Sequence, residues 1–459
     1  MNFSNNLTCF KAYDIRGKLG QELNEDIAYR VGRATAQSQK ATAVIVGFDA
    51  RATSSNLAQA VAKGICDAGA NVLDIGLAGT EEVYAFVSEF GACAGIEVTA
   101  SHNPIDYNGM KIVGRGSQPL SGDEFEAIKN LAEGRNFIQP LKKGAVTNKK
   151  EVARIAYVEK VLGFVDCSNL KPLKIVINSG NGAAGPTLDM INKKLVEIGI
   201  KTNFVFVHHN PDPTFPNGIP NPLLKENRLS TTDAVIKEKA DFGVAFDGDF
   251  DRCFFFDQCG CFVPGEYVVG LLSEVFLMKE QGATIIYDPR VIWNTIDVVS
   301  KFGGKAVVSK TGHAFIKAAM RKSDAIYGGE MSAHHYFRDF AYCDSGIIPW
   351  LLVWEFLSTS NLLLSNLISE GRKRFPSSGE LNFVVPNSAI CIERVHNHFA
   401  SQAISIDEID GLSMTFDTWR FNLRKSNTEP LVRLNAESKS DNALLQEKIN
   451  ELKFLIEQP

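Results

Sequence analysis

Residues 43–65 are AVIVGFDARATSSNLAQAVAKGI, an apolar run followed by a polar turn and an amphipathic stretch. The apolar run predicts a buried strand, and the spacing of apolar residues after the turn predicts a helix that packs against it. Residues 71–76, NVLDIG, and residues 95–104, GIEVTASHNP, predict a second and a third strand. Strands that alternate with helices in this way are typical of α/β folds.

The same order of elements occurs twice more along the chain. A second copy begins at residues 174–195, continues with FVFV at 204–207 and ends with DFGVAFDGDFDR at 241–252. A third copy comprises residues 284–302, 305–316 and 325–335. In each copy a strand ends in a small polar loop. Open α/β sheets bind their ligands outside the carboxyl ends of strands, so these loops are the first candidates for a functional site.

The repeat predicts four domains. Charged or Pro-rich stretches suggest boundaries near residues 150, 260 and 370, which gives the domains 1–150, 151–260, 261–370 and 371–459. Most of the last domain, about residues 381–459, does not repeat the pattern, and we expect a smaller α+β domain there.

Composition excludes several classes of protein. The 459 residues carry a net charge of -5, which gives no electrostatic reason to expect nucleic acid as a partner. Nine cysteines without a C-x-x-C pair suggest reduced thiols in a reducing compartment. The N-terminus lacks the layout of a signal peptide, and the longest apolar run, residues 347–354, is shorter than a membrane span. We therefore expect a cytoplasmic protein with no membrane partner.

The loop DGDFDR, residues 247–252, carries three acidic residues directly after the apolar run FGVAF. In an extended backbone alternate residues share a face, which would place Asp247, Asp249 and Asp251 on one side. Three adjacent carboxylates suit Mg²⁺, a hard cation that prefers oxygen ligands. Two alternatives stay open: a plain acidic turn, and a phosphotransferase in which Asp247 is the nucleophile.

The loop TASHNP, residues 99–104, places Ser101 beside His102. Neighbouring residues of an extended strand point apart, so we do not expect these two to form a Ser–His dyad, and no G-x-S-x-G elbow surrounds the serine. Asn103-Pro104 is expected to end the strand, and Asn108-Gly109 to form a second turn. An ordinary turn and a site of phosphoryl transfer both fit this pattern.

Two further loops carry polar groups. GGEMSAHH, residues 328–335, offers a carboxylate, a hydroxyl and imidazoles that could bind the hydroxyls of a polyol. RKSNTEP, residues 424–430, offers an Arg with short hydroxyl and amide side chains, a set that suits a phosphate dianion. Taken singly, each loop could also be a solvated turn.

Together and in this order, the four loops resemble those of the α-D-phosphohexomutase superfamily, and the resemblance covers essentially the whole chain. TASHNP is similar to its phosphoserine loop, DGDFDR to its metal loop, GEMSAHH to its sugar-binding loop and RKSNTEP to its phosphate-binding loop. The resemblance implies an α/β fold of four domains around a central cleft. Three of these would be related mixed α/β sheet domains, and the fourth a smaller α+β C-terminal domain.

The resemblance also implies roles for individual residues. Ser101 would carry the phosphoryl group, and Ser101, Asp247, Asp249 and Asp251 would bind Mg²⁺. The other catalytic positions would be His102, Arg16, Lys111, His313 and Arg252, among which Arg16, Lys111 and His313 are alternative general acid–base residues. Substrate-binding positions would be Tyr13, Arg290, Thr311, Gly312, Glu330, Ser332, His334, Arg424, Ser426, Asn427 and Thr428. Relatives often carry Lys where this chain has Arg290, which leaves the role of that contact open.

GEMS at residues 329–332 is similar to the phosphomannomutase/phosphoglucomutase branch. This implies an isomerase that interconverts mannose 6-phosphate and mannose 1-phosphate through a phosphoserine and a hexose 1,6-bisphosphate, and that supplies GDP-mannose for surface polysaccharide. Glucose phosphates, which differ only at C2, are alternative substrates. The expected partners are small hexose phosphates, and the expected state is a monomer or homodimer. An aspartyl-phosphate phosphotransferase and a non-catalytic sugar-phosphate-binding protein are the alternatives outside this class.

Overall fold

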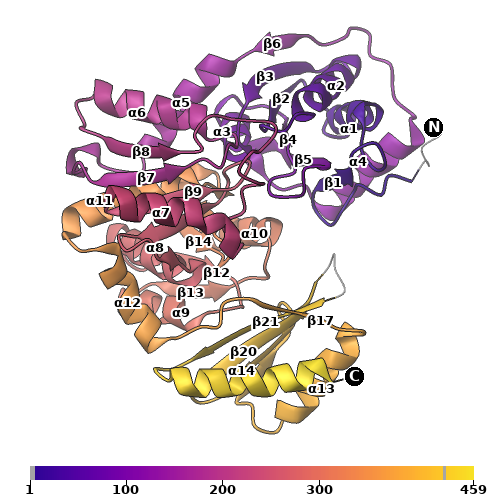
Figure 1. Ribbon diagram of the computed structural model, residues 1–459. Coiled ribbons are helices and arrows are strands. Elements are labelled where there is room, and N and C mark those ends of the chain that lie inside the picture. The colour runs from indigo at the N-terminus through magenta and orange to yellow at the C-terminus, as the bar shows by residue number, and fades with distance from the viewer. Residues whose placement is uncertain (1–5, 427–430, 459) are drawn as a thin grey trace. The chain divides into compact units, whose positions relative to one another are not determined.

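The computed structural model describes residues 6–426 and 431–458 (Figure 1). The chain forms two compact units. Unit 1 comprises Met1–Phe262 and Asp339–Asn361, and unit 2 comprises Val263–Arg338 and Leu362–Pro459.

Unit 1 contains two of the expected sheets. Its strands are β1 (Ile15–Lys18), β2 (Ala43–Phe48), β3 (Asn71–Leu77), β4 (Ala94–Val98), β5 (Tyr107–Gly114), β6 (Val146–Asn148), β7 (Lys174–Asn178), β8 (Asn203–Val207), β9 (Phe242–Phe246), β10 (Cys253–Asp257), β11 (Phe262–Val263, at the border of the units) and β16 (Cys343–Asp344). Its helices are α1 (Glu25–Ser38), α2 (Ser54–Asp67), α3 (Thr80–Glu89), α4 (Gly122–Gly134), α5 (Lys150–Leu162), α6 (Gly185–Glu197), α7 (Leu229–Glu238) and α11 (Ile347–Ser360).

Unit 2 contains most of the third sheet and the C-terminal domain. Its strands are β12 (Thr284–Tyr287), β13 (Lys305–Val308), β14 (Tyr327–Gly329), β15 (His335–Phe337), β17 (Leu381–Val384), β18 (Ser405–Asp407), β19 (Leu412–Thr415), β20 (Trp419–Lys425) and β21 (Leu431–Ser438). Its helices are α8 (Gly265–Lys279), α9 (Trp293–Lys301), α10 (His313–Ser323), α12 (Leu364–Arg374), α13 (Ser388–Phe399) and α14 (Asn442–Glu457).

The three expected repeats share one sheet topology. In each, the first strand (β2, β7 or β12) lies between the next two strands and pairs with both in parallel. The third strand of each repeat then pairs antiparallel with the strand that follows it: β4 with β5, β9 with β10, and β14 with β15. The predicted class of three related mixed α/β sheets is therefore confirmed.

Helices cover both faces of the first sheet. On one face α1 and α2 lie side by side (Figure 1), and they approach closely because Gly32 faces Val61 and Gly64 faces Tyr29. A Cβ atom at Gly64 would lie 2.0 Å from the carbonyl oxygen of Tyr29, so the helices could not keep this spacing with a larger residue. On the other face α3 packs against the sheet through Val83. This leaves the ends of β2 and β4, and the loops that follow them, to carry polar side chains.

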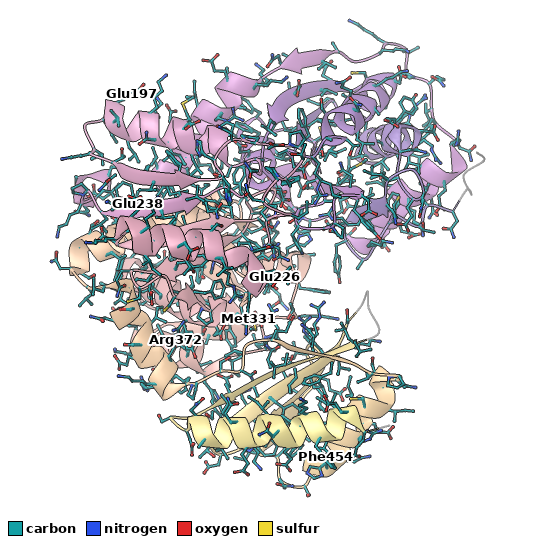
Figure 2. All side chains as sticks on the ribbon, in the orientation of Figure 1. Glu197, Glu226, Glu238, Met331, Arg372 and Phe454 are labelled. Atoms are coloured by element: carbon teal, nitrogen blue, oxygen red, sulfur yellow. The ribbon has the colours of Figure 1, made fainter. Side chains whose placement is uncertain are left out.

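The C-terminal domain differs from the repeats, as expected. Its strands form an antiparallel sheet in the order β17-β21-β20-β19-β18. Figure 1 shows α13 and α14 on one face of this sheet, and both helices contribute to its apolar core. Helix α14 is amphipathic: Leu452 and Ile456 are buried, whereas Phe454, labelled in Figure 2, is 67% exposed.

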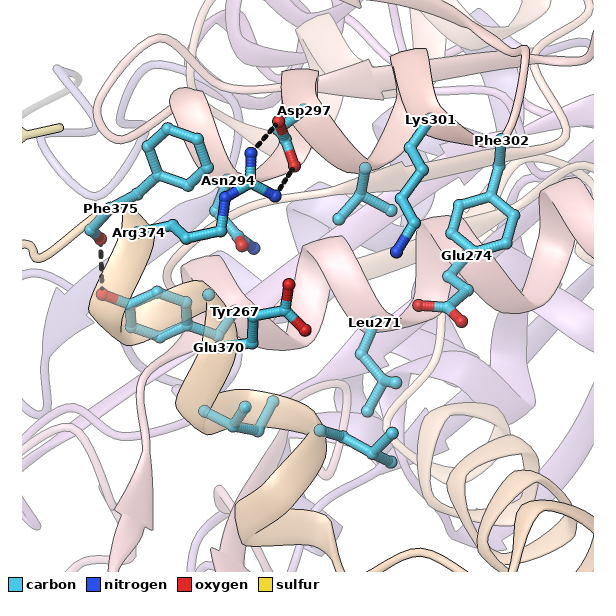
Figure 3. Close-up of a pocket in the computed structure, with 14 residues that line it drawn as sticks. Tyr267, Leu271, Glu274, Asn294, Asp297, Lys301, Phe302, Glu370, Arg374 and Phe375 are labelled. Atoms are coloured by element: carbon cyan, nitrogen blue, oxygen red, sulfur yellow. Dashed lines mark hydrogen bonds and ion pairs between the residues drawn. The ribbon is translucent and has the colours of Figure 1, made fainter. Parts of the chain in front are cut away.

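A cavity in unit 2 lies among α8, α9 and α12 (Figure 3). Arg374 at the end of α12 makes two 2.6 Å hydrogen bonds to Asp297 of α9. The hydroxyl of Tyr267 in α8 donates to the carbonyl of Phe375 at 2.8 Å. These contacts fix the helix that leads into the C-terminal domain.

Two local expectations are wrong. The strand that precedes TASHNP ends at Val98, before the loop and not within it. Asn108 and Gly109 form no turn but lie inside β5, where the side chain of Asn108 donates to Ser54 at 2.9 Å. Gly109 is needed there because a Cβ atom would lie 2.1 Å from the carbonyl oxygen of Ile15 in the paired strand β1.

No single helix in residues 6–426 and 431–458 is long and apolar enough to cross a membrane, and the bent pair α11 and α12 passes that test only together. The predicted domain limits at residues 150, 260 and 370 stay predictions.

Candidate active site

The serine loop presents the Ser101 hydroxyl to the acidic loop of the second sheet. Ser101 Oγ donates to Asp247 Oδ2 at 2.7 Å and also lies 3.0 Å from His102 Nδ1. The expectation that Ser101 and His102 point apart is therefore wrong. Its physical reason is the backbone of Ser101, whose φ of 46° is left-handed and not extended. Arg252 also donates to His102 Nδ1, and because a guanidinium can only donate, this nitrogen accepts.

Arg51 and Asp49, in the turn after β2, hold the serine loop in place. The buried Arg51 guanidinium donates to the carbonyl oxygens of Ser101 at 3.0 Å, Asn103 at 2.5 Å and Pro104 at 2.9 Å. Asp49 accepts from the hydroxyl of Thr99 at 2.7 Å. The sequence showed these two residues only as a polar turn, and nothing local indicated that they bind a loop about fifty residues further on.

The three aspartates gather as predicted, but not through the pleat of a strand. β9 ends at Phe246, and residues 247–252 form a turn in which Phe250 has a φ of 46°. Asp247, Asp249 and Asp251 are all buried, and each offers one carboxylate oxygen within 4.8 Å of the others. The turn thus brings together the side chains that an extended strand was expected to align.

Two positively charged side chains offset the negative charge of the acidic loop. Lys111, on β5, donates to Asp249 Oδ2 at 2.8 Å and contacts Asp251, and Arg252 Nε donates to Asp247 Oδ2 at 2.8 Å. Burial opposes charge at Lys111, but Asp249 and Asp251 outweigh it and raise the pKa of the ammonium. Burial also raises the pKa of Asp249, yet Lys111 holds it below its ordinary value. Asp249 and Lys111 therefore both stay charged at neutral pH.

The carboxylates fit a metal ion. Oδ1 of Asp249 is buried and has no hydrogen-bond partner in the described part of the chain, and a buried carboxylate oxygen is stable only with a cation or a donor. Carboxylates that offer hard oxygen ligands from one turn suit a divalent cation. These residues can hold a metal ion, as the sequence indicated.

Arg16 and Tyr13 lie at or beside β1, the edge strand of the first sheet. Arg16, on β1, donates to the carbonyl oxygens of Thr99 at 3.0 Å and Ile15 at 2.9 Å, and this places it beside the serine loop. Tyr13 precedes β1 and is 40% exposed. The structure therefore brings Ser101, His102, Arg16, Lys111, Arg252 and the three aspartates together within unit 1.

Glu97 is a buried carboxyl group that the sequence did not indicate. It lies on β4, directly opposite Lys111 on β5, and is 1% exposed. Neither carboxylate oxygen has a hydrogen-bond partner among the described residues. Burial, reinforced by the negative charges of Asp49 and Asp249, raises the pKa of Glu97 well above its ordinary value. Glu97 is therefore protonated in the folded chain at pH values where it ionises in the unfolded chain.

This difference predicts a pH dependence of stability. As the pH rises above the ordinary Glu pKa, the unfolded chain loses a proton that the folded chain keeps, so the free energy of unfolding falls by up to about 1.4 kcal/mol per pH unit. Glu97→Gln lacks this effect, and its stability relative to the parent should rise from pH 5 to pH 8 in urea unfolding. The exposed Glu151→Gln is the control. If the free energies of unfolding of Glu97→Gln and the parent differ by the same amount at pH 5 and pH 8, Glu97 is ionised in the folded chain.

In unit 2 the predicted sugar loop is centred on Glu330. This buried carboxylate accepts from the Gly312 amide at 2.9 Å and from the Tyr336 hydroxyl at 2.6 Å. Arg290, also buried, donates to Ser332 Oγ at 3.2 Å and lies 3.8 Å from Glu330. The structure thus brings Arg290, Gly312, Glu330 and Ser332 together.

Arg290 is fixed by a neighbouring carboxylate. Its Nε and Nη2 donate to the two oxygens of Asp288 at 2.9 and 3.0 Å, and Asp288 also accepts from the Met331 amide at 2.8 Å. Burial opposes charge at Arg290, but Asp288 outweighs it and raises the pKa of the guanidinium. A bidentate pair of this kind suits Arg and not Lys, which explains why Arg occupies this position.

Among the remaining predicted residues, Arg424 lies in β20 and His313 is the first residue of α10. Arg424 donates to Glu380 at 2.9 Å, and Glu380 lies 3.7 Å from Arg290, so the two guanidinium groups share one carboxylate. The Ser426 amide donates to Leu431 at 2.9 Å. Thr311 and His313 flank Gly312 at the start of α10, and His334 lies in the turn between β14 and β15. Asn427 and Thr428 lie outside the described residues.

Comparisons with known proteins agree with this organisation. Models of domains I, II and III and of the C-terminal domain of phosphoglucomutase/phosphomannomutase match residues 8–139, 155–260, 264–375 and 380–452. The chain is 56% identical to a phosphomannomutase of Vibrio cholerae, with 98% of each chain covered. It is 48% identical to a protein of Xanthomonas campestris named "Phosphohexose mutases", with 98% of this chain and 99% of that chain covered.

A solved structure supports the same conclusion. The phosphoglucomutase/phosphomannomutase family protein of Burkholderia thailandensis has a TM-score of 0.87 and 31% identity, and the match covers 99% of this chain and 98% of that one. Four domain models in order and relatives of this identity over nearly the whole length leave one assignment: the chain belongs to the phosphoglucomutase/phosphomannomutase family, whose members are phosphohexomutases.

Proposed function

We propose that the chain is a phosphomannomutase that interconverts mannose 6-phosphate and mannose 1-phosphate through a phosphoserine at Ser101. The observation that carries this proposal is the 2.7 Å hydrogen bond between Ser101 Oγ and Asp247, one of three buried aspartates. A serine hydroxyl held against a carboxylate cluster with two nearby cations suits phosphoryl transfer, in which charge must be neutralised around the moving group.

In the proposed reaction Ser101 Oγ takes a phosphoryl group from a hexose 1,6-bisphosphate. The bond between phosphorus and the sugar oxygen breaks, the bond between phosphorus and Ser101 Oγ forms, the serine hydroxyl loses its proton and the sugar hydroxyl gains one. Lys111 and Arg252 supply positive charge beside the serine loop. Mg²⁺, held by Asp247, Asp249 and Asp251, would further neutralise the charge of the phosphoryl oxygens.

In the opposite direction phosphorylated Ser101 gives its phosphoryl group to the free hydroxyl of a hexose monophosphate and so regenerates the bisphosphate. The bisphosphate turns end over end between the two transfers, so the group that returns to Ser101 comes from the other end of the sugar. Glu330 and Ser332 are proposed to bind sugar hydroxyls, with Arg290 holding both in place. Arg424 and Ser426, with Asn427 and Thr428, are proposed to bind the phosphate that does not react. His102, Arg16 and His313 keep their predicted roles around the transfer step, and Tyr13, Thr311, Gly312 and His334 keep theirs at the substrate.

The proposal of mannose as the substrate rests on relatives. Those 53–56% identical to this chain are named phosphomannomutase. We accordingly propose a cytoplasmic enzyme, monomeric or homodimeric, that supplies mannose 1-phosphate for GDP-mannose and surface polysaccharide. Dual activity on glucose phosphates is the second candidate, because the "Phosphohexose mutases" relative is 48% identical.

The structure argues against Asp247 as a phosphorylated nucleophile. Its side chain is fully buried, and Oδ2 accepts from both Ser101 and Arg252. A nucleophile whose oxygen is already held by two donors is poorly placed to attack phosphorus.

The chemistry of the phosphoenzyme tests the proposal. After incubation of the chain with radiolabelled glucose 1,6-bisphosphate, the label should survive acid and resist hydroxylamine, as a phosphoserine does. A label released by hydroxylamine and lost in Asp247→Asn would assign the chemistry to the aspartate. Turnover of mannose 1-phosphate and glucose 1-phosphate should then be compared as kcat/KM. A chain that forms no phosphoenzyme and turns over neither sugar would be a binding protein.

A further inference from the structure

The segment GTEE, residues 79–82, joins the start of α3 to the acidic loop of the second sheet. Its Thr80 is fully buried. The Thr80 hydroxyl donates to Asp249 Oδ2 at 2.6 Å, and the Thr80 amide donates to the Asp249 carbonyl at 3.2 Å. One residue thus holds both the side chain and the backbone of a proposed metal ligand that lies 169 residues further along the chain.

The two oxygens of Asp249 are in different surroundings. Oδ2 receives hydrogen bonds from Thr80 and from Lys111, the latter at 2.8 Å. Oδ1 is buried and has no hydrogen-bond partner among the described residues. A buried charged oxygen without a partner is unfavourable, so this atom requires a cation or a donor. The donors on Oδ2 therefore determine which oxygen of Asp249 remains for the metal.

The neighbours of Thr80 fix its position. Gly79 packs directly on the ring of Phe250 within the acidic loop, and a Cβ atom there would lie 2.3 Å from that ring. Glu82 accepts from the Gly79 amide at 2.9 Å and from the Thr187 hydroxyl at 2.9 Å. The start of α3 is thus held on both sides of Thr80, and the hydroxyl has little freedom to leave Asp249.

We propose that Thr80 is a positioning residue for the metal site: its hydroxyl holds Asp249 Oδ2, turns Oδ1 toward the divalent cation and so sets the affinity for that cation. This rests on the proposed function, in which the aspartates hold Mg²⁺. Groups that orient the ligands of a metal typically contribute about 10- to 100-fold to its affinity.

Thr80→Val and Thr80→Ser form a matched pair of variants. Valine has the shape of threonine but cannot donate, whereas serine keeps the hydroxyl and loses a methyl group. Mn²⁺ binding to the full chain without substrate, measured by electron paramagnetic resonance, should weaken about 10- to 100-fold in Thr80→Val and remain within about threefold of the parent in Thr80→Ser. Turnover of Thr80→Val should recover at high Mg²⁺ concentration.

Thermal unfolding in the presence of chelator separates positioning from folding. If Thr80→Val does not fold, Thr80→Ala takes its place with the same expected loss of affinity. Equal Mn²⁺ affinity in the parent and the variant without the hydroxyl would overturn the proposal, as would a loss of equal size in Thr80→Ser. A parent chain that binds Mn²⁺ but has no mutase activity would refute the proposed function and leave this test intact. A parent chain that binds no Mn²⁺ would overturn both.

Discussion

Replacing Ser101 with Ala should lower the turnover of mannose 1-phosphate by at least about 10³-fold, which corresponds to about 4 kcal/mol of transition-state stabilisation. The physical reason is that Ser101 Oγ is the proposed acceptor of the phosphoryl group, with Asp247 at 2.7 Å and His102 at 3.0 Å around it. Without it there is no oxygen to form the covalent intermediate. The labelled phosphoenzyme should disappear together with the activity.

The serine variant needs controls because Ser101 is also buried in its loop. Ser168→Ala, at an exposed serine of unit 1, should turn over mannose 1-phosphate like the parent. The Tm of Ser101→Ala should lie within a few degrees of that of the parent. Arg51 holds this loop through hydrogen bonds to backbone carbonyls, which the substitution keeps. Residual turnover above about one per cent would show that Ser101 does not carry the phosphoryl group.

Removing one partner of the buried pair Arg420–Glu437 should lower the free energy of unfolding of unit 2 by about 3–5 kcal/mol. The two side chains are 1% and 0% exposed and lie 2.9 Å apart. Arg420→Met leaves a buried carboxylate whose counter-charge is gone, and Glu437→Leu leaves a buried guanidinium. An isolated charge in such surroundings costs far more than the pair contributes by its attraction.

The pair also fixes part of the predicted substrate site. Arg420 donates to the carbonyl oxygens of Pro289 and Arg290 at 2.9 and 3.0 Å, and Glu437 accepts from the amides of Ile292 and Trp293 at 2.7 and 3.1 Å. Arg420→Met should therefore also raise the KM for the hexose phosphate. The backbone carbonyls of Pro289 and Arg290 then lose the hydrogen bonds that hold the Arg290 side chain in position.

Calorimetry of the two single variants and the double variant measures this coupling. The double variant should be less destabilised than the sum of the single variants, since neither charge then remains alone. The exposed pair Lys193–Glu197 on α6 provides the control, and Glu197 is labelled in Figure 2. Glu197→Gln should change the free energy of unfolding by less than about 0.5 kcal/mol. If the double variant loses as much free energy of unfolding as the two single variants together, Arg420 and Glu437 act separately.

Much of the site could be predicted because its residues cluster in short loops. TASHNP, DGDFDR and GEMSAHH each keep their candidate side chains within a few positions, so the loops could be singled out from the sequence, and their resemblance to phosphohexomutase loops implied the roles. The residues that hold these loops could not be found in this way. Arg51 belongs to a turn, Thr80 to a helix and Glu97 to a strand, and only the fold brings them to the site.

The threefold strand–helix repeat, the acidic and serine loops and the family could be recognised without coordinates, because apolar periodicity and short motifs are local properties of the chain. The contacts between the side chains of those loops, in contrast, depend on how distant parts of the chain pack together. Ser101 and Phe250 have left-handed backbones that contacts from other elements hold in place. This is why Ser101 touches both His102 and Asp247, although an extended strand would have separated the serine from its neighbour.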